Sequence, residues 1–138
     1  MTYLIDANVV SEIRRRRPDR SVLDWLAETA SAEQHLSVLT VGELRRGAAL
    51  LRRRDQRAAA SLDSWIDETV SEHRDRLVPV TIEVAERWAR IGVPDPVPPV
   101  DGLLAATALV HDWTLVTRNT ADFARTGVRT VNPFTRER

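Results

Sequence analysis

Short β-rich segments alternate with longer segments of helical periodicity along nearly the whole chain, and this alternation restricts the fold more than any other feature. Runs of β-branched and aliphatic residues predict strands at residues 3–5, 35–40, 76–80, 114–117 and 129–133. Between them, apolar residues recur at spacings of three and four, which is typical of helices. Strands that alternate with helices form a parallel sheet with helices on both faces. The sequence therefore predicts an α/β fold, an α/β/α sandwich with a central, mostly parallel sheet.

The helices are predicted from the same periodicity and from local capping residues. They cover residues 8–16, 21–29, 40–54, 56–72, 81–91 and 101–111, with one further helical turn at 119–123. We expect Asn8 to cap the first helix and Pro18 to stop it. Four prolines in GVPDPVPPV (92–100) predict a loop there, because proline removes a backbone donor and blocks a helix.

Composition limits the class of protein. A chain of 138 residues is about one domain, and 43% hydrophobic with 29% charged residues is globular composition. No apolar run approaches the roughly 18 residues of a membrane helix. A strand pattern and Asp6 follow Met1 directly, so we expect no signal peptide. Without cysteine, disulfides and thiolate metal sites are excluded and zinc is disfavoured. We expect a cytoplasmic protein.

Four carboxylates occupy equivalent places in the predicted fold. Asp6 and Asp122 follow strands, whereas Glu43 and Asp101 lie in the first turn of helices that come after a strand or a loop. In a parallel α/β sheet, the carboxyl ends of strands and the amino ends of helices share one edge, which holds ligand sites. We therefore expect four separate connections to deliver the four acids to one rim.

Each acid also has a purely structural interpretation, and taken singly that interpretation is the more common one. Asp6 suits a turn or a helix N-cap. Thr40 and Glu43 have the spacing of a capping box, and Asn119 and Asp122 that of a variant of it. Asp101 complements the helix dipole. Four like charges on one rim, however, would repel one another and raise one another's pKa.

A divalent cation would relieve that repulsion. Mg²⁺ takes oxygen ligands, few of them from protein and the rest from water and substrate phosphate. The histidines offer no rival site, since His35, His73 and His111 fall at no metal-ligand spacing. An acidic metal site suits phosphodiester hydrolysis, because the metal polarises the phosphate and lowers the pKa of its bound water. The absence of a Walker sequence and of a dinucleotide-binding glycine motif excludes two common phosphate-binding classes.

The basic residues are all arginine and lie partly in clusters, at residues 14–17, 45–46 and 52–54. Such runs are usually a solvated helix face, and contact with nucleic acid is the alternative. A formal net charge of zero argues against a purely electrostatic nucleic-acid binder.

Four stretches resemble a known family when taken together and in order. They are LIDANVVSE (4–12), LSVLTVGELRRG (36–47), DGLLAATALVHDWTLVTRNTADF (101–123) and NPF (132–134). They resemble the PIN-domain toxins of type II toxin–antitoxin systems, the VapC family and especially its FitB-like branch, from residue 3 to about residue 134. The resemblance implies that residues 1–138 are a single PIN domain, a PIN-like α/β/α sandwich.

The resemblance also implies an activity and partners. It implies a Mg²⁺- or Mn²⁺-dependent endoribonuclease that cuts structured RNA such as tRNA or rRNA. It implies a homodimer held inactive by a cognate VapB-like antitoxin in a larger complex, with operator DNA bound only through the antitoxin and no membrane association. We expect the antitoxin to lay an apolar segment across the helices, with Trp25 and Trp65 as candidates for its groove, and to bring an arginine to the acidic rim.

Carried over by motif, the resemblance assigns the site residues. The catalytic acids are Asp6, Glu43, Asp101 and Asp122. Asp6 and Asp101 are implied as metal ligands, with Glu43 and Asp122 binding the metal directly or through water.

Three polar residues match supporting positions of the family motifs, and two positions depart from them. The matching residues are Asn8, Thr117 and Asn119. Asn8 is expected to support Asp6, and Thr117 and Asn119 are expected to orient water or Asp122. The chain has Ala7 where threonine is common and Asp112 where glycine is frequent, and Asp112 receives no role.

Two other classes remain as alternatives. The Asp6-x-Asn8 pattern resembles the first motif of haloacid-dehalogenase-like phosphatases, whose nucleophilic aspartate also follows the first strand. That class needs a second aspartate where this chain has Asn8, and it needs a lysine, which this chain lacks. The other alternative is a catalytically silent PIN-like module that acts only in a regulatory complex with antitoxin and DNA.

Overall fold

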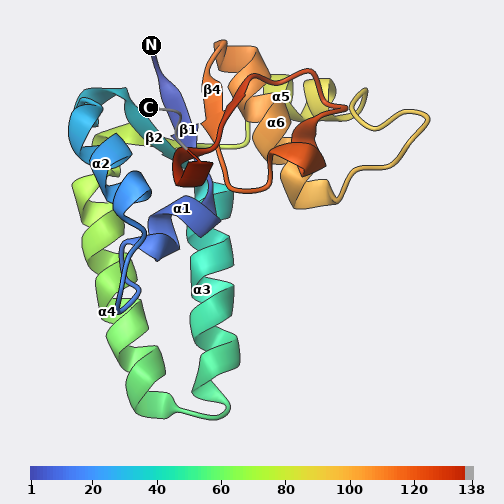
Figure 1. The fold of residues 1–138 in the computed structure, drawn as a ribbon. Helices are drawn as coiled ribbons and strands as arrows, with labels where there is room; N and C mark the ends of the chain where they lie inside the picture. Colours follow the sequence, from blue (N-terminus) through green and yellow to red (C-terminus); the bar gives the residue numbers. More distant parts are fainter. Residues whose placement is uncertain (136–138) are drawn as a thin grey trace.

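A five-stranded parallel sheet forms the centre of the protein. The computed structural model describes residues 1–135 and has the strand order β3-β2-β1-β4-β5, in which every pair is parallel (Figure 1). The strands are β1 (Tyr3–Ile5), β2 (Gln34–Ser37), β3 (Leu77–Val78), β4 (Thr114–Val116) and β5 (Thr130–Val131). The predicted α/β class and parallel sheet are confirmed.

The strand order reverses beside β1. From β1 the chain builds outward to β2 and β3, then returns to the other side of β1 for β4 and β5. In open α/β sheets, ligands bind outside the carboxyl ends of the strands at such a switch point. Asp6 comes directly after β1 and therefore lies at the switch point of the sheet.

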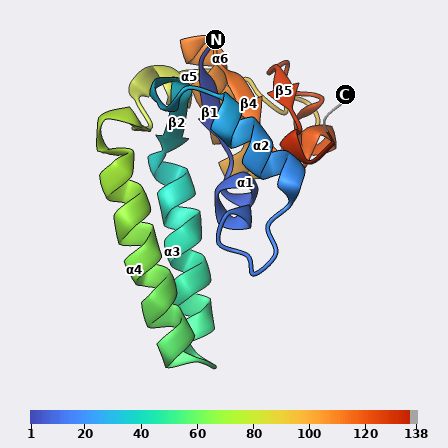
Figure 2. The ribbon, with the colours of Figure 1, turned by 60° about the vertical axis from the view of Figure 1, so that its left-hand side comes forward.

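Helices cover both faces of the sheet, and two of them extend far beyond it. The helices are α1 (Ala7–Glu12), α2 (Arg20–Glu28), α3 (Val38–Arg52), α4 (Gln56–Glu72), α5 (Ile82–Trp88) and α6 (Pro99–His111). Short 3₁₀ helices are η1 (Ser31–Glu33), η2 (Arg74–Arg76), η3 (Thr120–Phe123) and η4 (Pro133–Thr135). In both views α3 and α4 form a hairpin that projects away from the sheet (Figures 1 and 2). Through residue 135, none of these helices has the length and apolar character needed to span a bilayer.

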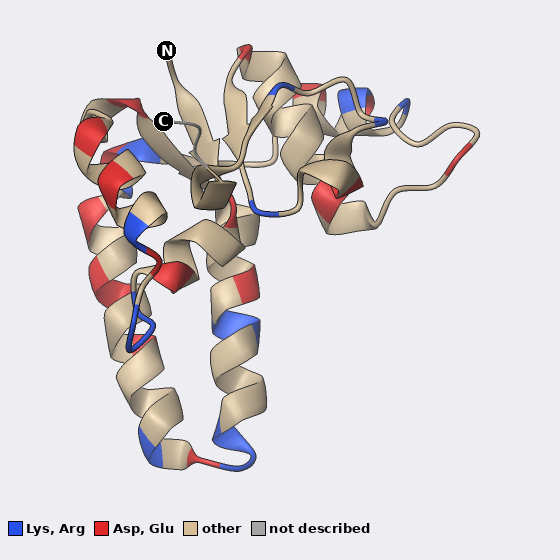
Figure 3. Ribbon diagram, in the orientation of Figure 1, with Lys and Arg blue, Asp and Glu red and all other residues tan. Residues whose placement is uncertain are grey.

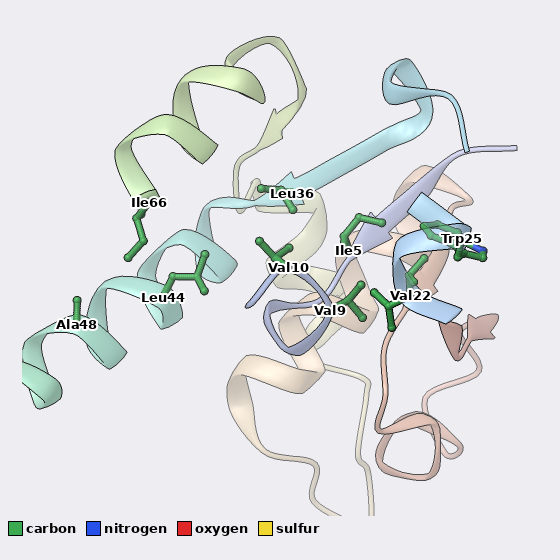
Figure 4. Close-up of a cluster of buried hydrophobic side chains, with 10 residues drawn as sticks. Ile5, Val9, Val10, Val22, Trp25, Leu36, Leu44, Ala48 and Ile66 are labelled. Carbon is green, nitrogen blue, oxygen red and sulfur yellow. The ribbon is translucent and has the colours of Figure 1, made fainter. Parts of the chain in front are cut away.

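The core divides into two clusters because neighbouring strand residues point to opposite faces. Ile5 of β1 belongs to a cluster with residues of α1, α2, α3 and α4, which Figure 4 shows in close-up. Leu4, the preceding residue, belongs to a second cluster formed mainly with α6 and η3. Both side chains are almost completely buried, which fixes the direction of β1 and therefore the place where Asp6 emerges.

The start of the first helix differs from the prediction. Asp6, not Asn8, is the N-cap of α1: its Oδ1 atom accepts a hydrogen bond from the Ala7 N–H at 2.8 Å. The helix also ends at Glu12, well before Pro18. The helix can begin directly after β1 because Asp6 keeps an extended backbone and still satisfies a free N–H group.

The predicted capping boxes are not formed. Strand β2 ends at Ser37, whose hydroxyl caps α3 by accepting from the Leu39 N–H at 3.0 Å. Thr40 is therefore a buried residue inside the helix, and Glu43 lies in its second turn instead of its first. Asn119 precedes η3 but makes no side-chain cap bond to it.

Helix α6 begins two residues before the predicted start. Pro99 occupies its first position, where the missing N–H of proline is not needed. Asp101 nevertheless lies in the first turn, as predicted.

Candidate active site

Three of the four predicted acids line one open cleft at the carboxyl edge of the sheet. The cleft has a volume of about 460 Å³. Its lining residues are Asp6, Ala7, Asn8, Ser11, Glu43, Leu44, Gly47, Leu62, Asp101 and Asn119. The cleft is thus formed by five parts of the chain: the loop after β1 with α1, helix α3, the first turn of α6, the loop after β4 and one residue of α4.

Asp6 is the most buried of the three acids that line the cleft. It is only 7% exposed, and its carboxylate accepts three hydrogen bonds. The Ala7 N–H donates to Oδ1 at 2.8 Å; the Thr117 hydroxyl and the Asn8 amide donate to Oδ2 at 2.8 and 3.3 Å. Burial raises the pKa of Asp6, and the hydrogen bonds from Thr117 and Ala7 act in the opposite direction. The three hydrogen bonds thus hold the Asp6 carboxylate in one orientation at the switch point of the sheet.

Asn8 and Thr117 connect the two segments that meet at Asp6. The Asn8 amide also lies 3.4 Å from the Thr117 hydroxyl, and its oxygen accepts from the Arg118 N–H at 3.2 Å. The Thr117 hydroxyl accepts from the Asn119 N–H at 3.1 Å. These bonds attach the loop after β4 to the start of α1, across the place where the strand order reverses.

Glu43 and Asp101 complete an acidic group around Asp6. Burial raises the pKa of Glu43, and the charges of Asp6 and Asp101 raise it further. Burial likewise raises the pKa of Asp101, with added effects from the charges of Asp6 and Asp122. Repulsion among the acids is therefore present, but desolvation is the larger cause for both groups.

Asp122 occupies a more peripheral place. It is exposed on η3 and does not line the cleft, although its charge reaches Asp101. Asn119, in the same segment, does line the cleft. The structure thus brings Asp6, Glu43, Asp101, Asn8 and Asn119 to one surface, buries Thr117 behind it, and leaves Asp122 at its margin.

The donor set fits a hard divalent cation, although the acids do not form a ready-made cage. Among residues 1–135, no three His, Cys, Asp or Glu side chains are grouped closely enough to hold a metal ion. Mg²⁺, however, keeps several waters and takes only one or two protein carboxylates. The cleft offers oxygen donors only, from carboxylates whose raised pKa values reflect poorly compensated negative charge.

The sequence did not single out Ser11, Gly47 or Leu62, which also line the cleft. Helix spacing could have indicated two of them, since Ser11 is three residues after Asn8 and Gly47 is four after Glu43, so each pair shares a helix face. Leu62 carried no such signal, because its presence depends on how α4 packs against α3.

A second, apolar groove lies beside the cleft. Ile5, Val10, Ile13, Leu26, Gln34, Leu36, Trp65, Thr69, Glu72 and His73 enclose about 230 Å³ between α1, α2 and α4. A shallow depression formed with Arg14 and Arg15 shares Ser11 and Leu62 with the acidic cleft and Trp65 with the groove. Trp65 therefore lines this apolar groove, whereas Trp25 is 8% exposed and packs edge-on against Tyr3 in the core.

The fold and the site define a class: a parallel α/β/α protein with a cluster of carboxylates at the switch point of its sheet. The family model that matches the sequence is the PIN domain, over residues 3–128. The chain belongs to the PIN-domain family and, within it, to the VapC-type toxins.

Individual relatives agree with this assignment over nearly the whole chain. The chain is 32% identical to the toxin FitB of Neisseria gonorrhoeae, covering 95% of this chain and 97% of that protein. It is 29% identical to the VapC ribonuclease Y4jK of Sinorhizobium fredii, covering 95% and 96%. Among solved structures, it matches a chain of the FitAB complex bound to the IR36 DNA fragment with a TM-score of 0.90, 31% identity and 99% coverage of both chains.

Proposed function

We propose that residues 1–138 form a single PIN domain that acts as the endoribonuclease toxin of a VapBC-type pair and hydrolyses phosphodiester bonds in structured RNA, such as tRNA or rRNA. The observation that carries this proposal is the cleft in which Asp6, Glu43 and Asp101 meet at the switch point. The ribonuclease relatives with the same domain support it.

The proposal includes a divalent cation, Mg²⁺ or Mn²⁺. Asp6 and Asp101 would hold it directly, with Glu43 and Asp122 binding directly or through water. When bound, such an ion polarises the phosphate and lowers the pKa of coordinated water. Thr117 and Asn8 fix the orientation of the Asp6 carboxylate, and that preorganisation lowers the cost of assembling the site.

Glu43 is suited to move a proton in the same reaction. It borders the cleft, and the residues described show no hydrogen bond to its carboxylate that would hold it in the ionised form. Burial, followed by the charges of Asp6 and Asp101, raises its pKa, and a higher pKa makes a carboxylate a better acceptor for the proton of an attacking water.

The proposed partners are a cognate VapB-like antitoxin, a second copy of the chain and, through the antitoxin, operator DNA. The solved relatives include FitAB and VapBC complexes, some of them bound to DNA. The apolar groove at Trp65 is where an antitoxin segment would lie, and it continues past Ser11 and Leu62 to the acids. An antitoxin arginine at the end of that path would compete with the cation for the carboxylates.

Cleavage of cellular RNA by the purified, antitoxin-free protein tests the proposed function. We expect cleavage with Mg²⁺ or Mn²⁺ that stops in EDTA. Asp6→Asn and Asp101→Asn should each remove nearly all cleavage, because a carboxamide keeps the shape of the side chain but lacks the charge that holds the cation. A smaller loss is expected for Asp122→Asn, because Asp122 lies at the margin of the cleft. Crosslinking followed by mapping of the 5′ ends identifies the RNA. Cleavage of equal rate in EDTA would refute the proposal.

The DNA-bound relatives also support the alternative of a catalytically silent module in a repressor complex. The same assay separates the two. A silent module gives at most trace cleavage that Asp6→Asn does not reduce, whereas the toxin loses its cleavage with that single change.

A further inference from the structure

The far half of the α3–α4 hairpin is strongly basic in a chain without net charge. Its arginines are Arg45, Arg46, Arg52, Arg53, Arg54 and Arg57. Between residues 45 and 57 the only acidic residue is Asp55, the N-cap of α4. Figure 3 shows blue segments on both sides of one red segment at the end of the projecting hairpin, at a distance from the sheet.

Ion pairs divide these arginines into two groups. Arg45 binds Asp63 and Asp67, and Arg52 binds Asp63 at 2.7 Å, so these two arginines connect α3 to α4. The other four are exposed and have no carboxylate partner within residues 1–135. They are Arg46, Arg53, Arg54 and Arg57. Their charge is uncompensated at the surface.

Helix geometry places part of this charge beside Glu43, on the solvent-exposed side of the acidic cleft. Gly47 lines the cleft and lies four residues after Glu43, so both are on one face of α3. Leu50, seven residues after Glu43, continues that face and is 56% exposed. Arg46 and Arg53 lie along one edge of this face, since offsets of three and ten residues rotate both of them by roughly 60–80° from Glu43, away from Gly47, at about 100° per residue.

The distance along α3 from the acidic cleft to the basic end of the hairpin corresponds to the length of a few nucleotides. Ten residues from Glu43 to Arg53 correspond to about 15 Å along the helix axis. A nucleic-acid strand advances roughly 3.4 Å per nucleotide in helical form, so about four nucleotides span the interval. Arginine binds phosphate bidentately, and the exposed Leu50 offers an apolar contact between the two ends.

We propose that this face of α3, from Glu43 past Arg46, Gly47 and Leu50 to Arg53, with Arg54 in the turn that follows, is the path along which the RNA strand leaves the acidic cleft. Arg53 and Arg54 hold its phosphates about four nucleotides from the bond that is cut, and Arg46 holds a phosphate closer to it. The proposal rests on the proposed ribonuclease function and assigns part of its substrate contact to the hairpin.

The test removes two of the unpaired charges and measures RNA binding and cleavage separately. The variant is Arg53→Gln/Arg54→Gln, and the control is Arg74→Gln/Arg90→Gln. The control removes the same charge from two exposed arginines outside the hairpin end, which also have no ion pair within the described residues. Binding of fluorescein-labelled tRNA, a structured RNA of the proposed substrate class, is titrated in EDTA at several salt concentrations. Cleavage of the same RNA is measured with Mn²⁺.

The hairpin variant should bind RNA several-fold more weakly, and its slope of log Kd against log salt should be smaller by about 1.4–1.8, about 0.7–0.9 for each lost phosphate contact. KM should rise with little change in kcat, and the control pair should match the wild type. Unchanged binding and slope in a protein that cleaves RNA would overturn the path while leaving the proposed function intact.

Two further outcomes are informative. If the variant loses affinity for the purified antitoxin but not for RNA, the basic face serves a protein partner and the path is wrong. If the wild type neither binds nor cleaves RNA, the proposed function fails and the path fails with it.

Discussion

Asp6 illustrates how one side chain serves both the fold and the site. Its Oδ1 atom caps α1, and its Oδ2 atom is held by Thr117 and Asn8. A carboxylate has about four lone-pair positions, so these bonds leave room for another ligand. The structural interpretation of Asp6 as a cap is therefore correct and does not compete with the catalytic one.

Removing the Thr117 hydroxyl should impair activity without removing a charge. The Thr117 hydroxyl lowers the pKa of Asp6, so Thr117→Val should raise that pKa further. Loss of an orienting partner of this kind costs about 10–100-fold in activity or metal affinity. The acid limb of the pH–rate profile should also move to higher pH, because Asp6 must be ionised to bind a cation. Thr107→Val, a buried threonine of α6 outside the cleft, is the control, and an unmoved acid limb would show that Thr117 does not act through Asp6.

Glu43 should reduce the stability of the metal-free protein at neutral pH. Below its ordinary pKa the group is protonated in both states and contributes nothing. As pH rises through the window between that value and the raised folded pKa, only the unfolded state loses its proton, so stability falls and stays lower above the window. Glu43→Gln should therefore raise the melting temperature in EDTA by a few degrees, for a gain of about 1 kcal/mol or less at this partly exposed site.

The gain from Glu43→Gln should disappear at acid pH, where protonation has already relieved the cost. Glu68→Gln, on the exposed face of α4, controls for loss of a helix carboxylate. Asp101→Asn is expected to gain less than Glu43→Gln, because Asp101 lies in the first turn of α6 and also interacts with the helix dipole. A Glu43→Gln variant that melts below the wild type at pH 7 would contradict the electrostatic interpretation.

At the scale of elements, the end of α6 explains the departure from the family at Asp112. This residue is the C-cap and has φ of 57°, a left-handed conformation that favours glycine. Its carboxylate forms an ion pair with Arg129 at 3.0 Å, but both side chains are mostly exposed, so the pair compensates only in part.

Asp112→Gly should therefore stabilise the protein by about 0.5–1 kcal/mol, since the left-handed backbone favours glycine at this position. Asp112→Ala should destabilise it, because alanine has neither the freedom of glycine nor the local hydrogen bonding of aspartate. Urea unfolding of the three proteins measures both changes. RNA cleavage should be unaffected, as Asp112 lies outside the cleft.

We expect the apolar groove between α1, α2 and α4 to be the binding site for the antitoxin segment. Trp65 lines it and is half-buried, so Trp65→Ala should weaken antitoxin binding by at least 2 kcal/mol, the usual loss at an aromatic anchor. Trp88→Ala removes a partly exposed tryptophan on α5 and should leave binding unchanged. Calorimetric titration with the antitoxin compares the two, and equal losses would place the interface elsewhere.

At the scale of the whole molecule, the cleft joins segments from both halves of the chain. Asp6 and Glu43 come from the N-terminal part and Asp101 and Asn119 from the C-terminal part. A ligand that bridges them therefore binds only the folded chain, and binding adds to stability.

Mn²⁺ or Mg²⁺ should consequently raise the melting temperature of the wild type. At a hundredfold excess over Kd the added stability is about 2.7 kcal/mol, which corresponds to several degrees. The shift should be much smaller for Asp6→Asn and for Asp101→Asn. Na⁺ at equal ionic strength controls for screening, and an equal shift with Na⁺ would show that no specific site is involved.

The sequence alone determined the class of fold and the places of the acids in it. Local periodicity distinguishes strand from helix, and parallel strands joined by helices bring their carboxyl ends to one edge. These two facts led to the prediction that Asp6, Glu43, Asp101 and Asp122 would share one rim. The structure brings the first three together in one cleft and leaves Asp122 at its margin.

Only the tertiary structure decided which of two locally equivalent residues takes a given role. That choice depends on contacts between elements that are distant in the sequence. Asp6 and Asn8 are both good N-caps, and the end of β1 selects Asp6. Trp25 and Trp65 look alike in sequence, but packing buries one in the core and leaves the other in the groove. Likewise, Arg45 and Arg46 are neighbours, yet the docking of α4 pairs the first with carboxylates and leaves the second free of them within residues 1–135. Such choices follow from which helix faces meet, and local periodicity carries no information about that.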